Sequence, residues 1–334
     1  MKAAGSRAAL PLLLVGVFCG ALASPARGQG GGEPPCPYSA CDPCFSQSWT
    51  IRGGMVALER ARPSGAVLVT DSFVGGAPLI DASDYQFGYE VGTDLWVIRH
   101  GAVVDLEFRW FQVNDWVATT PLFNSANGAV VHFLTPIGNT GLPSQVSSRY
   151  LSSLDSFELN VKLPLISWMS ALAGFRYIQL DEQGLAITQD VGPGANTATY
   201  GIDASNNLYG FQLGLDGMLW DRGGPFQIAA FAKAGVYGDD ARNRIRVNQT
   251  VGPAYASAAE ESHAVFVGEL GFTGVYQFNP HFSVRAGYQL TWIQGVALAS
   301  DQIAVSDPFN GNGGIDLTGC PFYHGFTVAA EVRW

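Results

Sequence analysis

Charged side chains recur at every second position within otherwise apolar stretches of this chain. Glu158 and Lys162, for example, alternate with Phe157, Leu159 and Val161. A period of two places alternate side chains on opposite faces of a β-strand. We therefore expect one face to carry the following charged residues: Glu90, Asp94, Asp105, Glu107, Arg109, Glu158, Lys162, Arg176, Asp216, Lys233, Glu269, Arg285, Glu331 and Arg333.

Acids and bases mixed on one face suggest two kinds of chemistry. In a tight space they pair across neighbouring strands, and the pairs then fix the fold. Alternatively, the same residues form the charged walls of a narrow conduction path that selects ions. The sequence leaves both readings open. If the groups are buried, loss of one partner costs about 3–5 kcal/mol.

A second group of residues raises the possibility of hydrolysis. Asp239-Asp240 and Glu261-x-His263 flank the same polar connection. A carboxylate or histidine within hydrogen-bond reach of a water can act as its general base. Three of these positions are ordinary loop acids, and a solvated rim is the favoured interpretation. The sequence therefore predicts no catalytic residue and no enzyme, with a hydrolase as the alternative.

The sequence predicts no metal site and no cofactor, since the histidines stand alone and no metal-ligand spacing links them to other donors. Cys36, Cys41 and Cys44 have the spacing C-x4-C-x2-C, and Cys320 makes a fourth cysteine outside the leading apolar segment. In an exported chain a disulfide is the expected use of these residues. Their pairing stays open.

The charged positions belong to ten long alternating segments, most of them longer than the roughly 9–11 residues with which a tilted strand crosses a bilayer. The segments are Trp49–Arg60, Asp84–Arg99, Ala102–Asp115, the two arms of the hairpin Leu154–Asp181, Asn207–Trp220, Phe226–Gly238, His263–Phe278, Phe282–Leu298 and Gly325–Trp334.

Short and long connections alternate between these segments. The long, polar ones are Ala61–Ser83, Trp116–Ser153, Glu182–Asn206, Asp239–Ser262 and Ala299–His324. Short turns on one rim and large external loops on the other are typical of outer-membrane barrels. We predict an all-β, up-and-down antiparallel transmembrane barrel of ten strands with periplasmic termini. We interpret Leu185–Gln189 and Asn243–Val251 as extensions of the barrel above the membrane; the alternative is a further spanning pair, which would make twelve strands.

Composition agrees with a barrel in lipid. Charged residues make up only 14% of the chain, against roughly 25% in soluble domains. Beyond the N-terminus no apolar run reaches the roughly 20 residues of a spanning helix. The net charge of −10 disfavours nucleic acid as a partner, because phosphate binding needs a basic surface.

The first residues predict export. Met1–Ala23 has a positive start, an apolar run and a small-residue cleavage site, as in a secretion signal. Residues 24–48 form a leader rich in glycine and proline that holds three cysteines, and 49–334 form the barrel. The expected location is the bacterial outer membrane.

Three strings resemble one family. They are LAGFRYIQLDE at Leu172–Glu182, NNLYGFQLGLDG at Asn206–Gly217 and KAGVYGDDA at Lys233–Ala241. They are similar to the beta-barrel porin-7 (BBP7) family of planctomycete outer-membrane proteins, over roughly Trp49–Trp334. The resemblance implies an outer-membrane barrel and supplies neither a catalytic residue nor a substrate.

The last strand resembles the signal that barrel-assembly machinery reads, which alternates apolar residues and ends in an aromatic one. Its positions are Phe326, Val328, Ala330, Val332 and Trp334. The expected partners are thus outer-membrane lipid and that machinery, with the oligomeric state open.

The leading functional hypothesis is a porin-like or structural barrel with a narrow, charge-paired lumen. The alternatives are an omptin-like hydrolase at the outer rim and an adhesion protein that acts through its external loops.

Overall fold

The structure, a computed structural model, describes residues 48–71, 76–138 and 141–334. These residues are almost entirely β-structure. Ten long strands form the main sheet: β1 (Trp49–Arg60), β4 (Tyr89–Arg99), β5 (Asp105–Thr119), β9 (Ser144–Ile166), β10 (Met169–Asp190), β11 (Thr197–Asp221), β12 (Phe226–Gln249), β13 (Tyr255–Asn279), β14 (Phe282–Gln294) and β15 (Phe322–Arg333).

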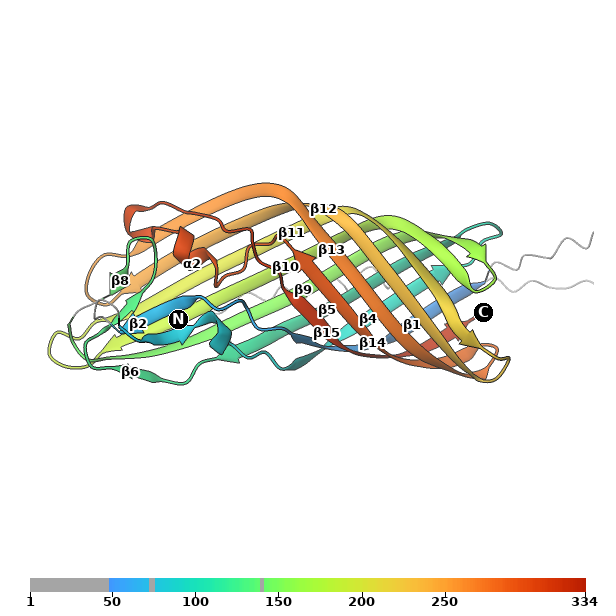
Figure 1. The fold of residues 1–334 in the computed structure, drawn as a ribbon, viewed down its shortest axis with the longest axis horizontal. Helices are drawn as coiled ribbons and strands as arrows, with labels where there is room; N and C mark the ends of the chain where they lie inside the picture. Colours follow the sequence, from blue (N-terminus) through green and yellow to red (C-terminus); the bar gives the residue numbers. More distant parts are fainter. Residues whose placement is uncertain (1–47, 72–75, 139–140) are drawn as a thin grey trace, which may run out of the picture. The chain divides into compact units, whose positions relative to one another are not determined.

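The ten strands close into a barrel (Figure 1). Each pairs in antiparallel fashion with its neighbours along the chain, and β1 pairs with both β4 and β15. The pair β9–β10 completes the ring. This confirms the predicted all-β, ten-stranded antiparallel barrel; the alternative of twelve strands is wrong.

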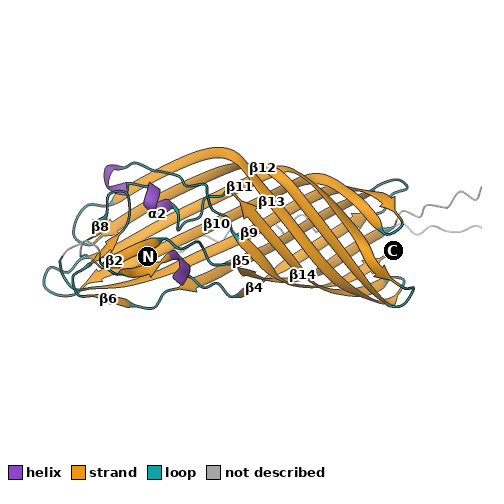
Figure 2. Cartoon of the chain, in the orientation of Figure 1, coloured by secondary structure: helices purple, strands orange, loops and turns teal. Residues whose placement is uncertain are grey.

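The two ends of the barrel differ. At one end, which we call the turn end, short connections join β4 to β5, β9 to β10, β11 to β12 and β13 to β14. Trp49 and Trp334 exchange backbone hydrogen bonds of 2.8 and 3.0 Å there. The other end, the loop end, carries the longer connections and the small elements β2 (Val67–Asp71), β8 (Ile137–Gly138) and α2 (Gln302–Val305) (Figure 2).

Two of the expected long loops are mostly strand, which corrects the prediction for Glu182–Asn206 and Asp239–Ser262. β10 and β11 continue to a turn at 191–196, and β12 and β13 continue to a turn at 250–254. These strands reach 22–25 residues, about twice the length that crosses a bilayer. The wall from β9 to β13 therefore extends well past any membrane.

The expectation that Leu185–Gln189 and Asn243–Val251 extend existing strands is confirmed, since β10 runs to Asp190 and β12 to Gln249. The rest of the extension was missed because the apolar residues change from the outer to the inner face along the strand. Toward the turn end of β12, Val236 is exposed on the outer face and Lys233 is buried on the inner face. Toward the loop end, Arg244 and Arg246 are exposed on the outer face and Ile245 is buried on the inner face. Outside lipid, water wets the outer face and the apolar side chains turn inward.

The other long connections fold against the inside of this tall wall. They form a second sheet of β3 (Pro78–Asp81), β2 (Val67–Asp71), β7 (Ala129–Val131) and β8 (Ile137–Gly138). Smaller elements accompany it: β6 (Phe123–Ser125), η2 (Ala82–Asp84), α2 (Gln302–Val305) and η3 (Pro308–Asn310). No helix among the described residues is long and apolar enough to cross a membrane.

We call the apolar interior that results the loop-end core. Leu68, Ile80 and Val131 of the small sheet are at most 4% exposed and join one cluster with the wall residues Tyr200 and Ile202. The expectation that these connections are polar external loops is therefore wrong in part. The reason is that isolated apolar residues between turns and polar segments give no periodic signal.

Buried polar groups of the wall fix the last long connection in place. Asn206 of β11 donates to the carbonyl of Ala297 (2.8 Å) and accepts from its amide (2.7 Å). Glu182 of β10 accepts from the amide of Ala299 at 3.0 Å. These bonds pair the backbone amide and carbonyl groups of an irregular segment inside the barrel, where water is excluded.

The outer face carries a broad apolar band toward the turn end. Phe157, Leu159 and Val161 of β9 are 43–59% exposed there. Such a band is what hydrocarbon covers in a membrane barrel. On β12 the band runs from Phe226 to Val236, and it ends before Asp240.

Leu159→Arg tests the position of the band. We expect the free energy of unfolding in lipid vesicles to fall by about 2–4 kcal/mol, the cost of a charge facing the bilayer midplane. Leu185→Arg is the matched control, because Leu185 is also exposed on the outer face but lies on the loop-end extension. It should lose less than about 1 kcal/mol. Equal losses at both positions would contradict this placement of the membrane.

Candidate functional site

Six charged side chains meet in the middle of the barrel, and we call them the central cluster. They balance one another, with three bases against three acids, and none is more than 6% exposed. The members are Arg109, Arg176, Lys233, Asp94, Glu158 and Glu269.

Strand register brings two of the six ion pairs of this cluster together. Arg109 and Arg176 are the direct cross-strand neighbours of Glu158 on either side. The contacts to its carboxylate measure 3.4 Å from Arg109 and 3.7 Å from Arg176. Lys233 reaches the same carboxylate at 2.6 Å. Three cations around one acid hold β5, β9, β10 and β12 together.

Arg109 also binds Asp94 of the neighbouring strand β4 at 3.1 Å. Further contacts cross the lumen. Glu269 of β13 binds Arg109 of β5 through one carboxylate oxygen and Arg176 of β10 through the other, the latter at 2.7 Å. In the ring order, β13 and β5 are five strands apart in either direction, so they face each other across the barrel. An ion pair spans the diameter of the barrel here, and the side chains fill the space between the walls.

Aromatic rings and amides complete this layer. The indole of Trp96 lies 4.5 Å from the Arg109 guanidinium carbon and 4.9 Å from the Lys233 nitrogen. Such cation–π contacts replace part of the hydration that buried cations lose. Gln212 donates to Glu158 at 2.8 Å, and Gln289 accepts from Arg109 at 3.0 Å. The layer is thus closely hydrogen-bonded.

Beside the central cluster lies a second charged group. Lys162 binds Glu107 at 3.1 Å and also binds Asp216. Asn160 links this group to the central cluster, because its amide donates to both Glu107 (3.1 Å) and Glu158 (3.2 Å).

Five of the predicted charged residues lie outside these two groups. Near the turn end, Arg285 binds Glu331 at 3.1 Å, and Asp105 binds His100 at 2.8 Å. Arg333 donates from Nε to the hydroxyl of Thr50 at 3.3 Å. Glu90 lies opposite Leu58, and none of the ion pairs in the described part of the chain includes it.

Sequence reasoning missed Arg52 and the pair Arg60–Glu182. Arg52 faces inward and binds Glu331; its segment contains Gly53 and Gly54, which blur the alternation. Arg60 and Glu182 form a fully buried ion pair inside the loop-end core. Continuing the inward positions of the first and fifth segments by period two would have found all three.

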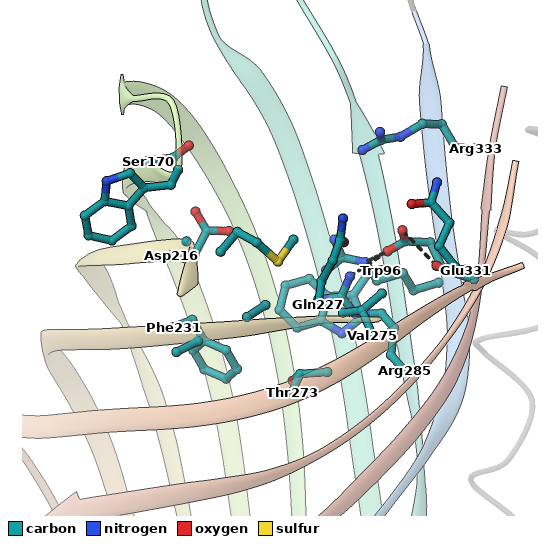
Figure 3. Close-up of a pocket in the computed structure, with 18 of the residues that line it drawn as sticks. Trp96, Ser170, Asp216, Gln227, Phe231, Thr273, Val275, Arg285, Glu331 and Arg333 are labelled. Atoms are coloured by element: carbon teal, nitrogen blue, oxygen red, sulfur yellow. Dashed lines mark hydrogen bonds and ion pairs between the residues drawn. The ribbon is translucent and has the colours of Figure 1, made fainter. Parts of the chain in front are cut away.

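A cavity of about 510 Å³ opens toward the turn end (Figure 3). Trp96, Glu107 and Lys233 line it where it meets the charged layers, so the charged layers close its inner side. Phe231 forms part of the wall because Gly271 leaves room for it: a Cβ at Gly271 would lie 2.2 Å from the ring. The cavity is therefore a cup with one blind end.

The candidate hydrolytic residues come together only in part. Asp239 and His263 are direct cross-strand neighbours on the inner face, on the loop side of the apolar band. The His263 Nε2 donates to the carbonyl of Gly295. Asp240 lies on the outer face, where its carboxylate accepts from Ser262 at 2.8 Å. The two aspartates thus point away from each other and cannot share a water.

Burial raises the pKa of the Asp239 carboxyl to about 6, and the neighbouring His263 offsets only part of this effect. A buried carboxylate is poorly solvated, so the neutral, protonated form is favoured. This group is therefore a source of pH dependence at the loop end.

The remaining predictions concern cysteines, metals and assembly. Cys36, Cys41 and Cys44 lie outside the described residues, and Cys320 is exposed with a free thiol. Within the described ranges no three metal-binding side chains gather. The predicted assembly positions are exposed on the outer face of β15 and of the residue that follows it. They are Phe326, Val328, Ala330, Val332 and Trp334. The role assigned to them stays a prediction.

Glu269→Gln should destabilise the barrel strongly. It leaves Arg109 and Arg176 buried with fewer negative partners, and we expect unfolding in vesicles to become easier by about 3–5 kcal/mol. The matched control is Glu260→Gln, which breaks the exposed pair with Arg242 and should cost less than about 1 kcal/mol. Similar effects for the two variants would argue against a buried network.

Asp239→Asn should change the pH dependence of stability. Because the folded pKa is about 6 and the unfolded value is about 4, the folded state binds more protons between these values. The free energy of unfolding therefore falls as pH rises through this window. The variant should flatten that fall in denaturant titrations, whereas Asp240→Asn should keep it. An unchanged slope in Asp239→Asn would refute the assignment.

Comparison with known proteins agrees with this architecture. The family model for beta barrel porin-7 (BBP7) matches residues 91–310, more than half of the chain. No curated protein matches. Among solved structures, the outer membrane protease OmpT from Escherichia coli has a TM-score of 0.47 and 10% identity, covering 87% of this chain and 97% of that one.

Two further likenesses are weaker. A Pseudomonas aeruginosa FadL homologue has a TM-score of 0.26 and 10% identity, with coverage of 86% and 90%. LpxR from Salmonella typhimurium has a TM-score of 0.25 and 10% identity, with coverage of 84% and 99%. None of these likenesses says what the present barrel binds. On the match of the family model, the chain belongs to the beta barrel porin-7 family of outer-membrane barrels.

Proposed function

We propose that the protein is a closed structural barrel of the outer membrane, without an open path for solutes in the described conformation. The observation that carries this is the pair Arg109–Glu269, which joins opposite walls of the lumen. Ten strands are close to the eight whose interior side chains just fill. The loop-end core adds a second, apolar obstruction above the charged one.

Both obstructions are costly to open. Separating the central cluster would leave unpaired charges in a confined space. Withdrawing the loop-end core would expose Leu68, Ile80 and the other apolar side chains to water. A porin-like barrel of this family thus acts as a scaffold in the membrane, with its turn end toward the periplasm.

Planar-bilayer recording tests the proposal. We expect the purified protein to insert without ohmic steps at moderate voltages, while an open porin in the same bilayers conducts. Insertion itself is verified independently by protease protection of the barrel in vesicles of the same lipid. Regular steps of constant conductance would overturn the closed-scaffold proposal in favour of a channel.

A hydrolase at the loop end is the second candidate. It is favoured by one observation, the cross-strand pairing of Asp239 with His263, which places an acid and a base side by side on the inner face. Against it, Asp240 lies on the opposite face. His263→Ala should abolish any peptide or ester cleavage that the wild-type protein shows, and unchanged cleavage would remove this candidate.

Adhesion to a partner stays a further proposal, for which no particular binding residue is assigned. Since the connections fold inward, its contact surface would be the polar outer face of the β10–β13 extension rather than free loops. Arg246 and Asp203 are exposed there and form a 3.1 Å ion pair.

A further inference from the structure

The wall of the turn-end cup formed by β14, β15 and β1 carries an excess of positive charge. Arg52, Arg285 and Arg333 all line the cavity, and the only acid on this wall of it is Glu331. Figure 3 shows Arg285, Glu331 and Arg333 together on one side of the cup, with Asp216 on the other. We call Arg52, Arg285, Arg333 and Glu331 the arginine wall.

One carboxylate neutralises only one of the three arginines. Glu331 binds Arg52, which lies directly opposite on β1, and Arg285 at 3.1 Å. Both interactions use the same oxygen, Oε2. The other oxygen, Oε1, accepts from Ser283 at 3.2 Å. None of the ion pairs among the described residues includes Arg333.

The rest of the lumen supplies only part of the missing negative charge. The central cluster balances its own three cations with three acids. Across the cup, Glu107 and Asp216 share the single cation of Lys162, which leaves one negative charge against the two surplus positive charges of the arginine wall. The surplus of the arginine wall therefore faces the open part of the cavity, at the end that communicates with the periplasm.

Guanidinium groups at such a wall match one class of ligand. Arginine binds carboxylates and phosphates through paired, charge-assisted hydrogen bonds. The side chains of Arg52 and Arg285 are 19% and 16% exposed, so they are held by the wall yet reachable from the cup. A cavity of about 510 Å³ accommodates a small molecule with room for water.

We propose that the arginine wall binds a small oxyanion, a carboxylate or a phosphate, that enters the cup from the periplasm. Arg285 and Arg333 supply the paired donors, and Arg52 adds charge from the adjacent strand. The site does not depend on whether the lumen conducts, because it lies on the turn-end side of the central cluster.

Isothermal titration of the detergent-solubilised full chain tests the site, with inorganic phosphate and succinate as separate probes at low ionic strength. We expect saturable binding of at least one probe at about one site per barrel. Arg285→Gln and Arg333→Gln should each weaken it about tenfold, which corresponds to about 1.4 kcal/mol. Which probe binds distinguishes a phosphate from a carboxylate ligand.

Arg246→Gln is the matched control, since Arg246 is an exposed arginine on the outer face at the loop end. It should leave the affinity unchanged. Arg333 is exposed at the rim, so its replacement leaves the fold intact, which circular dichroism verifies. The proposal is overturned by the absence of saturable binding up to about 10 mM of either probe, or by equal affinities in wild type, Arg285→Gln and Arg333→Gln.

Discussion

The ion pair between Arg109 and Glu269 is the interaction on which the interior of this barrel depends. It connects strands that face each other across the lumen, so it fixes the inner diameter as well as neighbouring walls. Because both partners are buried, neither can leave without a counter-charge. Around this contact the other cations, the carboxylates and the Trp96 indole arrange themselves as one layer.

This layer divides the interior into two regions of opposite chemistry. On the loop side the small sheet and the last connection form an apolar core against the tall wall of β9–β13. On the turn side a polar cup opens outward. The same strands serve both regions, because the inner face is polar within the lipid-covered part and apolar above it, where Ile245 and Tyr200 point inward.

The sequence predicted the features that depend on strict period two: closure into ten strands and the alternation of short and long connections. It predicted the loop-end extension only in part, at Leu185–Gln189 and Asn243–Val251. The full length was missed because the apolar side chains, such as Ile245, move to the inner face there and the charged ones, such as Arg244, to the outer face, and alternation alone does not tell lipid from water. It missed Arg52 because Gly53 and Gly54 interrupt the pattern. Which acid meets which base, as in Glu269 with Arg109, depends on closure of the whole ring and not on local spacing.

A double-mutant cycle between Arg109 and Glu269 tests the central claim most directly. The free energy of unfolding would be measured in vesicles for the wild type, Arg109→Gln, Glu269→Gln and the double variant. Because the pair joins opposite walls of the lumen, we expect a coupling energy of about 0.5–3 kcal/mol, so that the second substitution costs less once the first is made. Strictly additive effects would mean that the opposite walls are not held together by this pair.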